Sequence, residues 1–192
     1  MTEPLPGWYN DLDAFEAHAW AMLARGAADR RSPFHTPALA TVGADGAPRV
    51  RTVVLRGVDV SERVVRVHSD ARADKVAGIE RTGRAELMGY DRGAKLQLRA
   101  SGPATVHRAD GVADAAWEAT RSFSRACYRV EPRAGARIEA GGDYAQPSDG
   151  EDGRENFAVI RVRVEALEAL YLAAAGHRRA RFAPGDRAWL VP

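Results

Sequence analysis

Short apolar runs of strand length, separated by glycine, proline and Asp-Gly turn signals, restrict the fold of this sequence more than any other feature. The runs at 38–43 and 50–55 flank Asp45-Gly46, a pair typical of a tight hairpin turn. A small antiparallel sheet built from such strands most economically closes into a barrel. Further strands are expected at 64–68, 85–90, 95–100, 104–107, 157–164, 169–173, 179–182 and 188–191, with a bend or bulge at Gly102-Pro103.

Helical spacing appears in three places between these runs. Apolar residues from Leu12 to Leu23 recur on one face, with Asp13 in the first turn, which predicts an amphipathic helix over about 10–26. A short helix is expected at 73–81. A third stripe consists of Val112, Ala116, Trp117, Thr120, Phe123 and Cys127; we expect Trp117, Phe123, Cys127 and also Trp20 to lie in the core. The fold class is therefore α+β, mainly β, with peripheral helices.

Length and composition favour one domain covering residues 1–192. The chain has 192 residues, 45% of them hydrophobic, which is enough for one core of ordinary size. Residues 131–153 are rich in Gly, Asp and Pro and contain too few apolar residues for a core of their own. We expect a surface loop there, not a linker between domains.

Charge and cysteine content exclude several classes of function. The formal net charge of +2 gives no global field of the kind a dedicated nucleic-acid binder needs, so no nucleic-acid partner is expected. The single cysteine rules out an internal disulfide, and no His/Cys cluster has metal-ligand spacing. Apolar stretches long enough to cross a membrane are missing from the sequence. A soluble, cytoplasmic protein without a bound metal or membrane partner is expected.

The run Arg49 to Arg56 carries the strongest functional signal. Alternate residues of a strand share a face, so Arg49 and Arg51 would point the same way as Val53 and Leu55. Burying an unpaired guanidinium is costly, and its planar fork suits phosphate, so an anionic partner is one explanation. Solvated arginines on an edge strand are the other.

Three segments in register resemble the pyridoxamine 5'-phosphate oxidase family of FMN-binding split barrels. They are the runs 36–56, 69–75 and 97–102. Their order and spacing match those of the family over about residues 34–107, and residues 177–182 show a weaker similarity. The resemblance implies a split antiparallel β-barrel, FMN as cofactor and a homodimer with sites at the subunit interface.

The resemblance also implies roles for individual residues. Arg51 would hold the FMN phosphate while the backbone of 52–56 reaches the flavin ring. Ser69, Arg72 and Lys75 would supply further donors to the phosphate dianion. Gln97 would contact the ring across the subunit interface. The residues expected to bind the cofactor are Arg51, Thr52, Val53, Val54, Leu55, Arg56, His68, Ser69, Arg72, Lys75 and Gln97.

Departures from the family pattern concern the substrate. The oxidase reads its substrate's phosphate with Tyr, Arg and Ser spaced four residues apart, and this chain has Trp117, Arg121 and Arg125 instead. Trp cannot replace a phenol as a hydroxyl donor, although two arginines one helical turn apart could bind an anion. In place of a C-terminal Trp and Arg-x-His motif, the chain has Tyr171 and His177-Arg178-Arg179. The expected substrate-binding residues are Arg121, Arg125, His177 and Arg179.

The expected function is an FMN-dependent oxidoreductase acting on pyridoxine or pyridoxamine phosphate, or on a related small molecule, by hydride transfer to flavin N5. No catalytic side chain is assigned, although Arg56 could stabilise developing negative charge. Two alternatives stand beside it: a reductase using the deazaflavin F420, and a non-catalytic protein that binds FMN or senses redox state. Fold alone does not choose among them.

Overall fold

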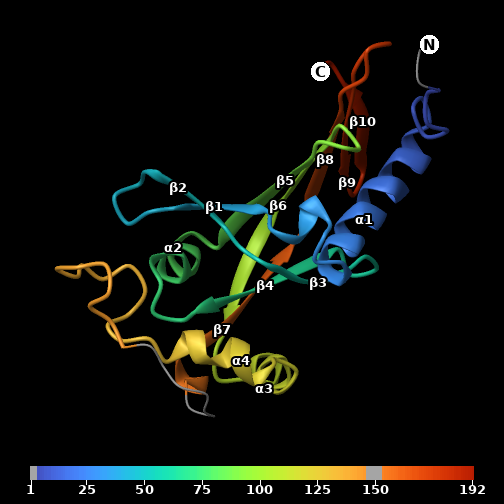
Figure 1. Ribbon diagram of the computed structural model, residues 1–192. Coiled ribbons are helices and arrows are strands. Elements are labelled where there is room, and N and C mark those ends of the chain that lie inside the picture. The colour runs from blue at the N-terminus through green and yellow to red at the C-terminus, as the bar shows by residue number, and fades with distance from the viewer. Residues whose placement is uncertain (1–3, 146–152) are drawn as a thin grey trace.

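A curled antiparallel sheet forms the body of the protein (Figure 1). The computed structural model describes residues 4–145 and 153–192. Within them, ten strands belong to the sheet. Their bounds are β1 (Ala38–Val42), β2 (Pro48–Thr52), β3 (Leu55–Asp59), β4 (Val64–Asp70), β5 (Arg84–Asp91), β6 (Leu96–His107), β7 (Phe157–Arg163), β8 (Ala166–Tyr171), β9 (Arg178–Ala183) and β10 (Asp186–Leu190).

The sheet curls into a split barrel, in agreement with the barrel that the strand pattern predicts. The order β2-β1-β5-β6 forms one half, and β6-β7-β4-β3 forms the other. The halves meet at β6, which pairs with both β5 and β7, and again where β2 runs on into β3. Strands β8, β9 and β10 extend the first half beyond β6. The model confirms the mainly β architecture with peripheral helices.

The expectation of one strand over 50–55 is wrong. The chain pairs with β1 as far as Thr52 and with β4 from Leu55 onward, and Val53 and Val54 make the crossing. The Val53 amide still donates to the Pro37 carbonyl at 3.0 Å, so the ladder continues briefly before the chain changes partner. A bulge between Leu55 and Gly57 follows, because the strand must bend sharply to join β4.

Strand β6 joins two runs that the sequence pattern separates. The expected strands at 95–100 and 104–107 form one continuous strand that changes partners at Gly102. Up to Ser101 it pairs with β8, and from Ala104 it pairs with β7. A Cβ atom on Gly102 would lie 1.9 Å from the carbonyl oxygen of Arg163. Only glycine allows this close crossing of two backbones.

The first two helices lie where the sequence pattern predicts them. Helix α1 (Leu12–Ala28) is capped by Asp11, whose carboxylate accepts from the Ala14 amide at 2.9 Å, and buries Phe15 and Leu23 against the barrel. It runs two residues beyond the expected end at Gly26. Helix α2 (Asp74–Thr82) ends at Gly83, whose φ of 66° is left-handed, as is common after a helix.

The third helical stripe does not form one helix. Helix α3 (Gly111–Glu118) stops, Arg121 is extended, and α4 (Ser122–Arg125) begins in a new direction. The break changes which side chains are buried. Trp117 and Trp20 lie in the core as expected, but Phe123 is 82% exposed and Cys127 is exposed, so the prediction of a core position for these two residues is wrong.

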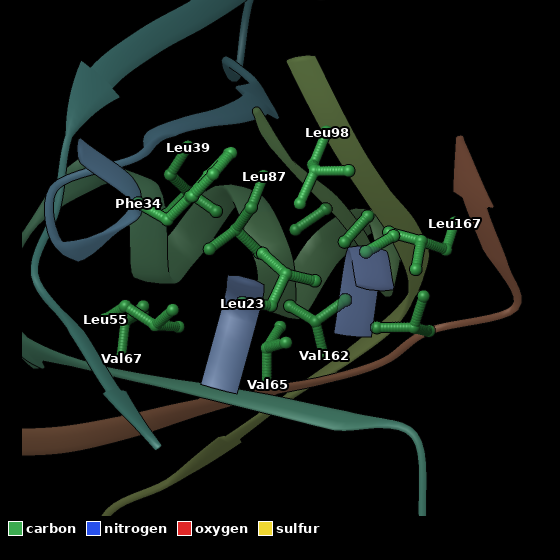
Figure 2. Close-up of a cluster of buried hydrophobic side chains, with 14 of the residues drawn as sticks. Leu23, Phe34, Leu39, Leu55, Val65, Val67, Leu87, Leu98, Val162 and Leu167 are labelled. Carbon is green, nitrogen blue, oxygen red and sulfur yellow. The ribbon is translucent and has the colours of Figure 1, made fainter. Parts of the chain in front are cut away.

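The hydrophobic core fills the barrel. Figure 2 shows side chains from α1, the barrel strands and the 3-10 turn at Pro33–His35 converging on one volume. Phe34 of that turn is fully buried, and its ring reaches Gly89, where a Cβ atom would lie 2.6 Å from the ring. A smaller cluster of Trp117, Tyr128 and Phe157 lies beneath α3. The main cluster includes residues of β3, β4 and β7, and the smaller one packs α3 against β7.

The glycine-rich segment contributes no helix or strand over its described part, residues 131–145. The remainder of the expected loop, up to residue 152, lies outside the described residues. Among the described helices, none is long and apolar enough to cross a membrane.

Replacing Gly102 with alanine should destabilise the fold by roughly 3 kcal/mol or more, because the new methyl group would overlap the Arg163 carbonyl. Urea unfolding followed by circular dichroism measures the change. Gly111→Ala is the matched control, since a Cβ atom at Gly111 meets nothing within 4 Å at the start of α3. Equal stability of the two variants would contradict the assigned role of Gly102.

Candidate functional site

A cationic cradle lies where β4 ends and α2 begins. Ser69 is buried at the end of β4, and Lys75 lies in the first turn of α2. The Lys75 ammonium donates to Ser69 Oγ at 3.1 Å, and Ser69 Oγ donates to the Asp70 carbonyl at 3.0 Å. The fold therefore brings together an ammonium and a hydroxyl that are six residues apart in the sequence.

Arg51 enters the same neighbourhood from β2. Its guanidinium donates to Thr41 Oγ1 at 2.7 Å and to the Leu39 carbonyl at 3.1 Å. Within the described chain, neither Arg51 nor Lys75 forms an ion pair with a carboxylate. Arg49, in contrast, is exposed and pairs with Asp45 at 2.6 Å, as expected of an edge-strand arginine. Of the two strand arginines, only Arg51 is left for an anion.

The pKa values of these two groups show that they share a site. Burial lowers the pKa of the Lys75 ammonium, and the nearby charge of Arg51 lowers it further. Burial also lowers the pKa of Arg51. Two partly buried cations that repel each other are stabilised by an anion between them. A phosphate group fits this donor set, because it accepts charge-assisted hydrogen bonds from guanidinium, ammonium and hydroxyl together.

Arg72 is placed differently from the other expected phosphate ligands. Its guanidinium donates to both carboxylate oxygens of Asp70, at 3.1 and 2.8 Å, and to the Val130 carbonyl at 3.0 Å. It also pairs with Glu131. The Arg133 guanidinium donates to the Arg72 carbonyl at 3.0 Å. Arg72 thus ties the start of the glycine-rich loop to the turn beside Lys75.

The crossing segment leads from this cradle into a cavity of about 350 Å³. Thr52 is exposed, Val53 is buried and Val54 is half-buried. Leu55 and Arg56, at the bulge, form part of the cavity wall. The segment expected to lie along a flavin therefore has Arg51, the residue expected to hold the phosphate, at one end and a cavity at the other.

Arginines dominate the polar part of the cavity wall. In the described residues, Arg30 follows α1, Arg56 lies on β3, Arg66 on β4 and Arg121 between α3 and α4. No carboxylate lines the cavity, and none of the four pairs with a described carboxylate. The apolar part of the lining consists mainly of alanines of α1 and α3, such as Ala27 and Ala116. The shape and charge suit a small molecule with an apolar body and an acidic group.

His68 contributes a neutral ring to this cavity. Burial lowers its pKa to about 4, and the charges of Arg56 and Arg66 act in the same direction. The ring packs edge-on against Phe157 with centroids 4.8 Å apart, and its Nε2 atom is buried with no hydrogen-bond partner in the described structure. The imidazole is therefore uncharged near neutral pH and faces the cavity from β4.

Only one residue of the Trp117, Arg121 and Arg125 triplet reaches the cavity. Arg121 lines it. Trp117 is buried in the aromatic cluster beneath α3. Arg125 stacks on Trp117, with its guanidinium carbon 4.9 Å from the ring centroid, and donates to the Trp117 and Thr120 carbonyls at 2.9 Å. Arg125 caps the end of α3, because the helix break turns its side chain back toward those carbonyls.

The remaining expected site residues lie on the outer face of the sheet. Gln97 on β6 faces Leu170 of β8 across the ladder, and Leu170 faces Arg179 of β9. Arg179 pairs with Glu168 at 2.9 Å. His177 is exposed in the turn before β9 and lines a separate cavity of about 480 Å³ with Arg178. One chain therefore gathers the phosphate residues and Arg121 but leaves these three elsewhere.

Sequence reasoning missed Arg30 and Arg66 as cavity residues. Arg66 and His68 alternate along β4 with buried valines, so a shared face could have been noticed from the pattern. Arg30 follows the end of α1, and nothing in the sequence indicates which cavity it faces. Thr41, the partner of Arg51, was also missed, because only the β1–β2 register brings the two together.

Removing either cation of the cradle should weaken FMN binding. For Lys75→Met and Arg51→Met we expect about 10- to 100-fold higher Kd, since each loses a charge-assisted hydrogen bond to phosphate. Quenching of flavin fluorescence on titration gives the Kd. Arg92→Met is the control. Arg92 is exposed in the β5–β6 turn, and its substitution removes one positive charge, as each cradle variant does. Unchanged affinity in both cradle variants would show that the phosphate binds elsewhere.

Comparison with solved structures agrees with the fold. The fold resembles that of a pyridoxamine 5'-phosphate oxidase-related, FMN binding protein from Nostoc punctiforme PCC 73102, with TM-score 0.69 and 21% identity over 99% of this chain and 100% of that one. It also resembles PhzG from Burkholderia lata 383, with TM-score 0.72 and 19% identity over 100% of this chain and 99% of that one. A Clostridium acetobutylicum protein related to general stress protein 26 has TM-score 0.56 and 11% identity, over 90% of this chain and 96% of that one.

A family model identifies part of the chain from its sequence. Residues 17–108 match the model described as "Pyridoxamine 5'-phosphate oxidase, FMN-binding domain". The match includes the crossing segment, the cradle residues and the first half of the barrel. It confirms the resemblance found in the sequence and names FMN as the cofactor of this segment. Residues 17–108 are thus similar in sequence to the FMN-binding domain of the pyridoxamine 5'-phosphate oxidase family.

Proposed function

We propose that this protein is an FMN-dependent oxidoreductase that transfers a hydride between FMN and a small acidic substrate. The observation that carries the proposal is the arginine-lined cavity at the end of the crossing segment. Leu55 and Arg56 belong both to the run expected to lie along the flavin and to the wall of that cavity. A substrate in the cavity would therefore lie beside the cofactor, as hydride transfer requires.

Bound FMN would supply the redox chemistry, because its N5 atom exchanges a hydride with the substrate. The protein's part is binding and orientation. Arg56 of β3 and Arg121, between α3 and α4, both line the cavity and would hold an acidic group of the substrate through charge-assisted hydrogen bonds. The apolar alanine wall would cover the rest of the substrate and exclude water.

The substrate class extends beyond vitamin B6 phosphates. Trp117 is buried in an aromatic cluster and offers no hydroxyl to a substrate phosphate, and Arg125 is occupied by backbone carbonyls. Only Arg121 keeps the position that the oxidase pattern requires. A related small carboxylate or phosphate ester therefore fits better than pyridoxamine phosphate itself. The PhzG structure, which has a carboxylic acid bound, shows that this fold accommodates such a ligand.

A homodimer with composite sites is part of the proposal. Gln97 and Arg179 lie on the outer sheet face, whereas the cradle and Arg121 lie at the barrel. On that face Tyr90 of β5, opposite Gln97, is 43% exposed, and Met88 is 39% exposed. A second copy seated there would cover these apolar side chains and bring its Gln97 to the partner's flavin. The single chain does not bring these parts together.

The turnover prediction concerns the two cavity arginines. Purified FMN-loaded protein is mixed anaerobically with pyridoxine phosphate, pyridoxamine phosphate and a panel of small aromatic acids, and bleaching of the flavin absorbance is followed. For any active compound, Arg56→Met and Arg121→Met should lower kcat/KM about 10- to 100-fold through loss of the acid contact. FMN content should stay unchanged.

Arg92→Met again removes a charge away from the cavity and should retain wild-type turnover. If flavin binds tightly and no compound in the panel reduces it, the oxidoreductase proposal is wrong and the non-catalytic FMN-binding alternative is favoured. If reduction occurs and neither arginine variant changes it, the substrate lies outside this cavity.

The dimer prediction is tested by sedimentation equilibrium. The wild-type chain should sediment at twice its mass of 20.8 kDa. Tyr90→Glu should shift it toward the monomer, because a carboxylate would be buried in the interface without a partner. Val60→Glu, at a similarly exposed apolar residue in the β3–β4 turn, is the control and should stay dimeric. A monomeric wild type with full FMN affinity would contradict the composite site.

A further inference from the structure

A second cavity of about 400 Å³ adjoins the arginine-lined one. The two cavities share Arg66 of β4 and Ala115 of α3 as lining residues. Beyond Arg66, the second cavity is lined by Arg161 of β7, with Val58 and Val112 as apolar walls. Arg66 therefore stands at the junction of two spaces that together run along the outer side of β3 and β4.

Arg66 and Arg161 lie directly opposite each other in the β4–β7 ladder. Like charges in this position repel and destabilise a sheet. Over the described chain, neither guanidinium forms an ion pair. Many other arginines of the protein are paired, such as Arg99 with Glu86 at 2.6 Å. An unpaired cross-strand arginine pair at a cavity is therefore a position that an anion would stabilise.

The guanidinium of Arg66 is held in place by the backbone. Its Nη2 donates to the Arg56 carbonyl at 3.4 Å, and its Nε is buried with no hydrogen-bond partner in the described structure. A Cβ atom on Gly57 would lie 3.2 Å from Nε and Nη2, so glycine at the bulge leaves room for the planar group. A guanidinium held this way is preorganised for an oxyanion.

The carboxylate nearest to this pair is already engaged. Asp59 lines the second cavity, but it accepts hydrogen bonds from Ser61 Oγ at 2.7 Å and from the Glu62 amide at 3.0 Å. These bonds and the charge of Arg161 lower its pKa. Asp59 thus compensates part of the positive charge of Arg161 but does not neutralise it. The cavity keeps a net positive character at the Arg66–Arg161 pair.

We infer that the substrate carries two acidic groups, the second bound by Arg66 and Arg161. This inference rests on the proposed function, in which Arg56 and Arg121 hold the first acidic group. Arg66 and Arg161 are then specificity-determining residues: they distinguish a diacid from a monoacid with the same body. The position of Arg66 between the cavities makes it the link between the two subsites.

The test compares matched ligands by isothermal titration calorimetry at constant ionic strength. Dicarboxylates from succinate to suberate are titrated into the FMN-loaded protein, each beside the monocarboxylate of the same chain length. At the best-fitting length, the diacid should bind about tenfold more tightly, or better, than its monoacid. Arg161→Met should abolish this advantage, so that the diacid and its monoacid bind with equal affinity.

Three further variants complete the design. Arg163→Met is the matched control, because Arg163 lies on the same strand, is exposed and lines neither cavity; it should keep the diacid advantage. Arg66→Met should weaken both ligands, because Arg66 faces both cavities. Thermal melts establish that each variant is folded, and Arg161→Lys, which keeps the charge without the fork, should retain part of the advantage.

Equal affinity for diacid and monoacid at every chain length would overturn the inference, as would an unchanged advantage in Arg161→Met. Neither result touches the proposed function, because flavin reduction is not measured here. Conversely, a protein whose flavin no acid reduces would overturn the oxidoreductase proposal, while the preference for diacids would still be measured by binding alone.

Discussion

The crossing of the chain at Val53 and Val54 is the constraint on which the rest of the structure depends. Because the strand leaves β1 and joins β4 within two residues, the two halves of the barrel are linked covalently at that point. The crossing sends Arg51 toward the turn that holds Ser69 and Lys75, and it delivers Arg56 to the cavity. A straight strand over the same residues would pair with one neighbour throughout, and the cofactor segment would not connect two different sites.

Two groups of arginines in this protein differ in their electrostatic surroundings. Most surface arginines, such as Arg49 and Arg99, pair with a carboxylate and contribute little beyond solubility and local order. A second group surrounds the cradle and the two cavities and lacks carboxylate partners in the described structure: Arg30, Arg51, Arg56, Arg66, Arg121 and Arg161. Unpaired, partly buried cations cost stability, and folding of the surrounding barrel must offset that cost. Their concentration in one region distinguishes a binding surface from ordinary surface charge.

The sequence predicted the strands and the first two helices well, because alternation and helical spacing are local signals. It predicted the partners of Lys75 and Ser69 through resemblance, since their spacing along the chain says little about distance. Prediction from the sequence failed where the tertiary fold breaks a strand or helix that the local pattern shows as continuous. The crossing at Val53 splits a pattern that looks uniform, and the break before Arg121 exposes Phe123. Arg161 carries no local signal, because only the β4–β7 register places it opposite Arg66.

The neutral state of His68 has a consequence for how the cavity responds to acidity. With a pKa of about 4, this imidazole stays uncharged at neutral and mildly acidic pH, and the charges around it on β3 and β4 are guanidinium groups that do not titrate in that range. The electrostatic potential of that wall is therefore constant there. The β3 and β4 wall itself therefore adds nothing to a change in ligand retention between neutral and mildly acidic solution, and it favours the ionised form of an acidic ligand throughout that range.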